Sequence, residues 1–404
     1  MTGRDAIELR KRFKKDSGIS RIAGCYVNSN KEKVVTFEDS FFNIDEDETA
    51  KYLEIAKKAL SGSIGNNILE LDFESGSAEA QDMQKLLLDI KEDGLKDREL
   101  LNRLYDRIIE KHAYPDNYLI VLFHDRYDVL KMATDGTLLD ESEEVYEYVL
   151  TAICPVGLSK PGLGFLADEN RIGAVRRERV VDAPAVAFLF PAFNDRSADI
   201  HKVDFYVKDT KDGEARFAEE VLGCVSKLTA VQQRGEFAQI VKEAYKNDSS
   251  KYEDALMEIQ DSFNMRMEEK KTLGELEAEK PMELDDGLMK EVLDENEIDE
   301  DIAKDIVNGV KETFSRQIPT VNNLLDTRAV KAYAPKKREK ELIKEVVQLK
   351  NELEQPEYDV SVRVAPDRAD SIKAELVGTE LCLLIPMEGS EQVSVNGIRR
   401  SFDK

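Results

Sequence analysis

Apolar residues gather in short continuous runs in the middle of the chain and recur at helical spacing on both sides of it. Two of these runs are Tyr118–His124 and Ala185–Phe190, and Pro and Gly residues separate further strand-like segments between Ile153 and Val207. Apolar runs of this length, bounded by turn-forming residues, are typical of buried strands. We therefore predict that residues 116–210 form the β-rich core of the main domain.

The region before this core combines a hairpin with helices. A short basic helix is predicted over Asp5–Lys15, and two strand-like stretches flank the turn-forming run Asn28–Lys31. Apolar residues at helical spacing then predict helices over Ala78–Lys91 and Lys96–Lys111. We interpret residues 1–115 as an N-terminal hairpin and helical region.

The region after the core changes to a helical period, which predicts a helical region over residues 211–355. In residues 356–404 a short helix is predicted over Asp367–Leu376, between a strand pattern before it and two strand patterns after it. This order predicts a small terminal β-α-β-β module. The predicted fold class is therefore α+β, with a mixed or antiparallel central sheet and helical N-terminal and C-terminal-half regions.

Composition narrows the class of protein. The chain has 404 residues, of which 35% are charged and 41% are hydrophobic, which is typical of a folded, helix-rich, highly soluble protein. The four cysteines are widely separated and predict reduced thiols. No secretory signal is apparent at the start, and the longest apolar run, Ala183–Phe193, is about half the length that spans a bilayer as a helix. We expect a cytoplasmic protein with no membrane partner.

The formal net charge of −25 argues against a phosphate-binding surface that covers the whole molecule. Basic residues are nevertheless concentrated locally. Arg171, Arg176, Arg177 and Arg179 lie on predicted hairpin strands, and the segment Lys336, Lys337 and Arg338 is also strongly basic. A two-stranded ribbon of this kind can contact DNA phosphates. These seven residues are the candidates for nucleic-acid binding, and the alternative is that they are ordinary solvated faces.

Polar residues also gather where two predicted strands end. The turn Asn194-Asp195-Arg196 precedes His201, and His124-Asp125-Arg126 follows the first strand run. An Asp–His pair can orient an imidazole for general base catalysis. The candidate catalytic residues are accordingly His124, Asp125, Asp195, Arg196 and His201. The alternative is that Asn194 and Asp195 cap a turn while Arg196 pairs with a neighbouring carboxylate, because no nucleophile or oxyanion element is identifiable.

Metal and cofactor motifs are incomplete. None of the three histidines has a second His or Cys at metal-ligand spacing. Gly157–Gly162 resembles the start of a phosphate-binding loop but lacks the lysine that reaches the terminal phosphates. Gly162–Ala167 fits a G-x-G-x-x-A pattern that does not follow a strand. We therefore predict no metal and no cofactor.

Several segments carry a family resemblance, among them Leu9–Lys15, Gly24–Val27, Leu60–Gly65 and Phe188–Arg196. In these residues the chain resembles an uncharacterised bacterial family, found mostly in Firmicutes, that is catalogued as domain of unknown function 4317. The resemblance covers nearly the whole length and implies no activity.

A more distant similarity, of pattern and order, is to the nucleoid-associated proteins of proteobacteria. Three stretches carry it, Leu119–Tyr127, Val221–Gly235 and Pro366–Ile398. This similarity implies an association with the nucleoid. We interpret the chain as a non-enzymatic, macromolecule-binding protein whose partner is DNA or another protein. Two alternatives stay open: an enzyme of unknown reaction with a His/Asp/Arg pocket, and a scaffold whose acidic helices dock a basic protein.

Overall fold

The computed structural model describes residues 1–14, 18–132, 138–209, 216–246, 248–272, 281–315, 317–353, 370–386, 393–395 and 398–400. The chain divides into two compact units, Met1–Tyr333 and Ala334–Lys404. The α+β fold class predicted from the sequence is confirmed, since a large antiparallel sheet is combined with helices on both sides of it in the chain.

An eight-stranded sheet forms the centre of the first unit, in the order β2-β1-β4-β5-β9-β12-β3, with β8 paired to the end of β5. Each pairing within it is antiparallel. The strands are β1 (Ile19–Val27), β2 (Lys33–Ser40), β3 (Ile68–Asp72), β4 (Tyr118–Met132), β5 (Leu138–Leu158), β8 (Arg179–Val181), β9 (Val186–Phe190) and β12 (Lys202–Val207). Strands from both sides of residue 115 thus share one sheet.

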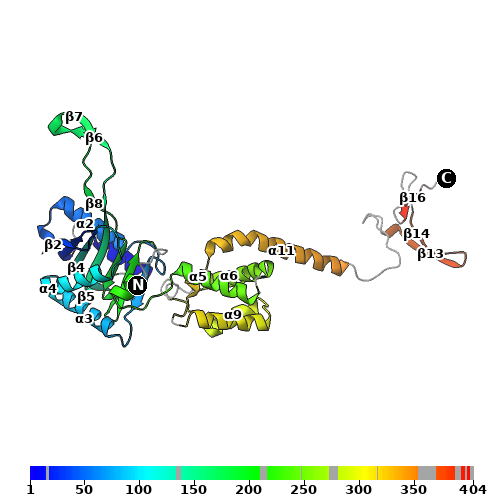
Figure 1. Ribbon diagram of the computed structural model, residues 1–404. Helices are drawn as coiled ribbons and strands as arrows, with labels where there is room; N and C mark the ends of the chain where they lie inside the picture. Colours follow the sequence, from blue (N-terminus) through cyan, green and yellow to red (C-terminus); the bar gives the residue numbers. More distant parts are fainter. Residues whose placement is uncertain are drawn as a thin grey trace. The chain divides into compact units, whose positions relative to one another are not determined.

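Helices cover both faces of this sheet, as Figure 1 shows. One face packs against α3 (Ala78–Asp93) and α4 (Arg98–Lys111), and the other packs against α1 (Gly3–Arg12) and α2 (Glu46–Ala59). Because both faces are covered, the central strand β9 is buried at every position, and a continuous apolar run is the pattern that such burial requires. The predicted helices over Ala78–Lys91 and Lys96–Lys111 are confirmed by α3 and α4.

A two-stranded arm leaves the sheet between β5 and β8. It consists of β6 (Leu163–Leu166) and β7 (Arg171–Ala174), joined by a 3-10 turn, η2 (Ala167–Glu169). Figure 1 shows β6 and β7 at the end of two extended legs that rise from β5 and β8. We call residues 159–178 the arm. A smaller hairpin, β10 (Ala192–Asn194) and β11 (Ser197–Asp199), contains the predicted Asn194-Asp195-Arg196 turn.

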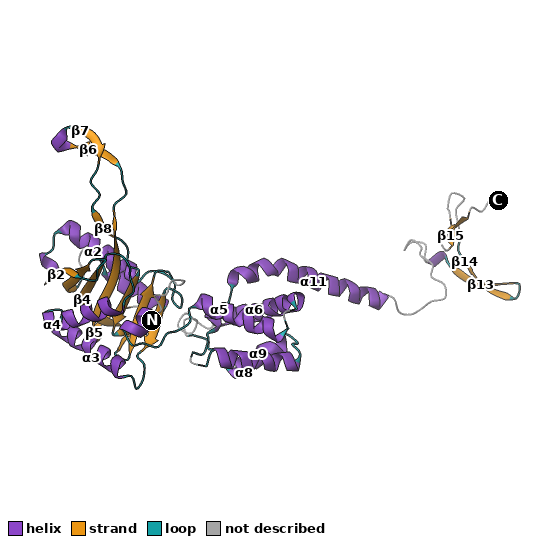
Figure 2. Cartoon of the chain, viewed as in Figure 1, coloured by secondary structure: helices purple, strands orange, loops and turns teal. Residues whose placement is uncertain are grey.

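The region after β12 is helical, as predicted and as Figure 2 shows by colour. A π-helical turn, η3 (Phe217–Val221), precedes helices that share a separate apolar cluster. These helices are α5 (Ala230–Ala244), α6 (Ser249–Thr272), α8 (Asp286–Glu295), α9 (Glu300–Thr313) and α10 (Val321–Leu324). No described helix combines the length and apolar character needed to cross a membrane.

The second unit contains most of α11 (Thr327–Leu353) and two hairpins, β13 (Lys373–Val377) with β14 (Glu380–Leu384) and β15 (Val393–Val395) with β16 (Ile398–Arg400). The helix predicted over Asp367–Leu376 is wrong in its described part, where β13 forms instead. Gly378 has φ +72 and permits the tight turn that pairs Val377 with Glu380. The strand predicted before that helix lies outside the described residues.

Candidate functional site

Asp125 and Arg196, two of the five predicted catalytic residues, hold helix α1 against the sheet. The Arg12 guanidinium of α1 donates to both Asp125 carboxylate oxygens, with Nε–Oδ2 at 3.0 Å and Nη2–Oδ1 at 3.1 Å. Tyr148 donates from its hydroxyl to the same Oδ2 at 2.8 Å, and Asp125 is fully buried. Both carboxylate oxygens are thus engaged, and Asp125 has no exposure to solvent. It positions α1.

The predicted turn of Asp195 and Arg196 contacts the same helix from another strand pair. Both residues have positive φ, and their backbone N–H groups donate to the Asp5 carboxylate at 3.2 and 3.3 Å. The Arg196 guanidinium donates to Glu8 of α1 and, at 2.6 Å, to the Leu130 carbonyl. The turn is therefore present, and Arg196 pairs with a carboxylate that is distant in the sequence.

The two predicted histidines lie elsewhere. His124 is buried, with Ser20 Oγ 2.6 Å from its Nδ1 and Glu147 Oε1 3.2 Å from its Nε2. Burial lowers the pKa of His124, and the Glu147 carboxylate opposes that effect only in part. His201 is exposed, and its Nδ1 lies 3.4 Å from the Gln84 amide nitrogen. The structure thus brings Asp125, Asp195 and Arg196 to α1 and gives the histidines other partners.

Other groups that could support catalysis are also engaged or shielded. Burial raises the pKa of Cys25 to about 11 and that of Cys154 and Cys224 to about 12, so these thiols are protonated at neutral pH. Within the described ranges, no three His, Cys, Asp or Glu side chains are grouped so that they could hold a metal ion.

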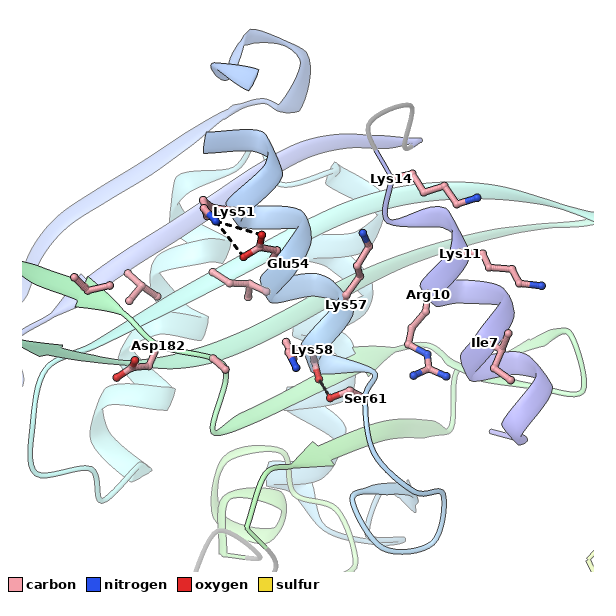
Figure 3. Close-up of a pocket in the computed structure, with 14 residues that line it drawn as sticks. Ile7, Arg10, Lys11, Lys14, Lys51, Glu54, Lys57, Lys58, Ser61 and Asp182 are labelled. Carbon is pink, nitrogen blue, oxygen red and sulfur yellow. Dashed lines mark hydrogen bonds and ion pairs between the residues drawn. The ribbon is translucent and has the colours of Figure 1, made fainter. Parts of the chain in front are cut away.

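A groove of about 940 Å³ lies on the outer side of α1 and α2, beside β8. Its apolar lining comes from three elements: Ile7, Ile55, Val180, Val181 and Ala183. Its cationic lining comes from the two helices and from the residue just after α1, Lys14: Arg10, Lys11, Lys14, Lys51, Lys57 and Lys58. Figure 3 shows Arg10 and Lys57 extending between α1 and α2, Lys11 on the opposite side of α1, and Lys14 beyond the end of that helix. We call this surface the cationic groove.

The charge of the cationic groove is opposite in sign to that of the whole chain. Its lining includes six cations and two carboxylates, Glu54 and Asp182, which gives a formal charge of +4, whereas the chain carries −25. Lys51 pairs with Glu54 at 3.2 Å, but both side chains are exposed, so this pair contributes little. Among the described residues, Lys57 and Lys58 have no carboxylate partner.

Helix polarity explains part of this arrangement. Arg10 and Lys11 lie in the last turn of α1, and Lys57 and Lys58 lie in the last turn of α2. Cations there interact favourably with the helix dipole, by about 0.3–1 kcal/mol each. The dipole favours a cation at the end of each helix separately, but it does not favour bringing the two basic ends together. Like charges within about 8–10 Å of each other repel at physiological salt. An anionic ligand would remove this repulsion.

Of the predicted nucleic-acid contacts, four lie in the arm or at its base. Arg171 pairs with Glu169, and Arg177 donates from Nε to the Ser159 carbonyl at 2.8 Å. Arg179 begins β8, directly before the groove residues Val180 and Val181, so the arm is continuous with the wall of the groove. Lys336, Lys337 and Arg338 lie on α11 in the second unit.

Sequence reasoning missed the cations of the groove. The signal that could have found them is their spacing: Ile7 and Lys11 share one face of α1, and Lys51, Ile55 and Lys58 share one face of α2. Each face combines an exposed or half-buried isoleucine with lysines one turn away. That pattern indicates a helix face with an apolar contact and an anionic neighbour.

A family model described as a domain of unknown function, DUF4317, matches residues 1–398. The chain belongs to the DUF4317 family. No curated protein matches it. Membership in DUF4317 confirms the family resemblance noted in the sequence and assigns no activity, so the similarity in pattern to nucleoid-associated proteins stays a prediction.

Proposed function

We propose that this DUF4317 protein binds duplex DNA through its phosphate backbone, in the cationic groove and along the base of the arm. The observation that carries the proposal is the groove itself, which has a formal charge of +4 on a chain of −25. Phosphate contacts from Lys and Arg supply most of the affinity of non-specific DNA binding. A local cluster of cations is what such contacts require.

The shape of the basic surface favours a polymer over a small anion. Arg176 and Arg177 in the arm and Arg179 at its base continue from the groove wall formed by Val180 and Val181. A small phosphate compound would occupy one end of this surface, whereas a DNA backbone can follow it. Backbone contacts of this kind position a duplex without reading its sequence.

The lining of the groove favours a duplex over a single strand. Proteins that bind single strands stack the bases on aromatic side chains. The groove is lined by aliphatic and charged residues, with no Phe, Tyr or Trp among them. A paired duplex presents phosphates and needs no such stacking surface.

The test is a salt titration of binding to a fluorescent duplex, with charge-reversed variants. Six phosphate contacts would give a slope of log K against log salt of about −5, since each contact contributes about 0.9. Lys57→Glu with Lys58→Glu should reduce the slope by about 2 and weaken binding by about tenfold or more. The matched control is Lys85→Glu with Lys96→Glu, two exposed lysines on or beside the helices that cover the other face of the sheet.

Three results would contradict the proposal. One is the absence of any duplex binding at low salt. Another is an equal loss of affinity in the groove variant and the control variant. The third is preferential binding of an acidic peptide, which would instead assign the groove to a protein partner.

A further inference from the structure

The arm carries an apolar face that no described residue of the first unit covers. Leu163 and Phe165 lie two residues apart on β6, and their cross-strand partners on β7 are Ala174 and Ile172. Alternate residues of a strand point to the same side, so these four side chains share one face. Their exposure is high: 78% for Leu163, 63% for Phe165 and 65% for Ile172. Exposed contiguous apolar surfaces usually mark a site of interaction.

The opposite face of the arm is built differently. Gly164 and Gly173 are paired there, and side chains fold over both glycines. A Cβ on Gly164 would lie 2.5 Å from Val175 Cγ2, and a Cβ on Gly173 would lie 2.7 Å from Arg171 Nη1. Larger residues at these positions would displace the covering side chains. The two glycines of this face are therefore covered by neighbouring side chains, whereas the face of Leu163, Phe165 and Ile172 is open.

Charge decides between the occupants of that open face. From Ser159 to Arg179 the chain has five cations and three carboxylates, which gives a formal charge of +2. Two copies of the arm would repel each other, whereas a polyanion would attract each one. The arm also joins the cationic groove through β8, so a polyanion in the groove would reach it.

The position of the apolar face distinguishes DNA from an anionic membrane. The four apolar side chains lie on the flat side of the hairpin, and the tip carries the polar residues Asp168, Glu169 and Asn170. A hairpin that entered a bilayer tip first would bring two carboxylates to the hydrocarbon region, which is costly. A hairpin that lies along a DNA groove presents its flat side to the base pairs and leaves its tip in solvent.

We infer that Leu163, Phe165 and Ile172 enter the minor groove of the bound duplex and wedge between base pairs, so that the protein kinks DNA. Proteins that bind the minor groove use apolar side chains in this way and bend the duplex by about 20–90°. The inference rests on the proposed DNA binding by the cationic groove and adds a distinct activity. Binding by the groove alone would leave the duplex straight.

The experiment measures bending and affinity in the same sample, with a duplex that carries a donor and an acceptor dye at its ends. The wild-type protein should shorten the end-to-end distance. The triple variant Leu163→Ser, Phe165→Ser and Ile172→Ser should bind within about tenfold of wild type, with an unchanged salt slope, and leave the duplex straight. An unchanged slope shows that the arginines of the arm are still in place.

Two further variants keep the test independent of arm folding. Phe165→Leu keeps an apolar wedge and should still bend DNA. Val34→Ser with Val35→Ser removes two exposed apolar side chains of β2, at 56% and 53% exposure, and should bend DNA as wild type does. A nicked duplex is already flexible, so wild type should prefer it several-fold and the triple variant should not.

The outcomes separate the two proposals. Binding without bending by the wild type, or equal bending by the triple variant, overturns the wedge and leaves DNA binding intact. No duplex binding overturns both. Binding to anionic phospholipid vesicles in place of the duplex would also overturn both and assign the arm to a membrane surface.

Discussion

Arg12→Met should release α1 from the sheet while the rest of the first unit stays folded. The Arg12 guanidinium makes two hydrogen bonds to Asp125, at 3.0 and 3.1 Å, and lies 4.3 Å from the ring centroid of Tyr127. Asp125 is fully buried, so the variant leaves a carboxylate without a cation in the interior. Met retains an apolar stem of similar length, which limits the change to the lost charge and hydrogen bonds.

The expected cost is about 3 kcal/mol in the free energy of opening α1. Breaking a buried ion pair by removing one partner costs about 3–5 kcal/mol. The Arg12 side chain is 22% exposed, which favours the lower end of that range. A cost of about 3 kcal/mol corresponds to an opening constant about 10² larger, since about 1.4 kcal/mol is tenfold.

Hydrogen exchange of the amides in α1 measures this opening directly. The matched control is Arg10→Met in the same helix, whose Nε donates to the Ala6 carbonyl and to no carboxylate among the described groups. The control should leave exchange unchanged but weaken DNA binding. Adding Asp125→Asn to Arg12→Met should restore part of the protection. Unchanged protection in Arg12→Met, or an equal loss across α3, would refute the reasoning.

Burial raises the pKa of Asp204 to about 7, above the unfolded value of about 3.9, so its contribution to stability is lost as pH rises from about 4 to 7. Asp204→Asn should raise Tm relative to wild type at about pH 8 and not at about pH 4. Burial lowers the pKa of His112 to about 4, so stability is lost as pH falls from about 6.5 towards 4, and His112→Phe should flatten that decline in thermal melts. Gly223 has φ +68, and a Cβ there would lie 2.8 Å from Ala80 Cα, so Gly223→Ala should cost about 2–3 kcal/mol in a denaturant titration. Gly235→Ala, with open space around it, should be neutral or stabilise α5 by about 0.5–1 kcal/mol, and equal effects of the two substitutions would contradict this explanation.

The fold could be predicted where the pattern of residues is local. Strands β4 and β9 are apolar over several consecutive residues, and α3 and α4 repeat their apolar residues at helical spacing. Strand β3 could not be predicted, because its five residues form an edge strand only by pairing with β12, which lies far along the chain. Strand β14 was predicted as a strand, but β13 was predicted as part of a helix, because its pairing with β14 outweighed the helical propensity of a short segment.

The candidate site could be predicted only in part. Asp125 and Arg196 are unusual in the sequence because they are polar residues beside buried strands, and they are indeed engaged with buried groups. Their partners, Arg12 and Glu8, lie on the first helix, and no local pattern links that helix to the turns that hold it. The packing of α1 against the sheet defines the role of Asp125 and Arg196. Helix α1 lies more than 100 residues before either of them in the sequence.

The groove and the whole molecule carry opposite charges, so the dependence of DNA binding on salt should have two parts. At about 0.1 M salt the Debye length is about 10 Å, so a phosphate in the groove experiences the nearby cations and little of the acidic remainder. At about 0.01 M the Debye length is about 30 Å, and the chain's net charge of −25 then repels DNA from a distance. The short-range attraction to the groove cations and the long-range repulsion by the net charge should therefore compete as salt is lowered.

Affinity for a duplex should therefore rise as salt falls towards about 0.05 M and then level off or decline. Without the repulsion, log K would keep rising linearly as log salt falls. The salt titration with the fluorescent duplex, described for the groove variants, measures this when it is extended to lower salt. Lys57→Glu with Lys58→Glu should weaken binding over the whole range, because it removes the local attraction and leaves the repulsion. A log–log plot that stays linear at the lowest salt would mean that the acidic part of the molecule does not act on the bound DNA, and the local character assigned to the cationic groove would then be wrong.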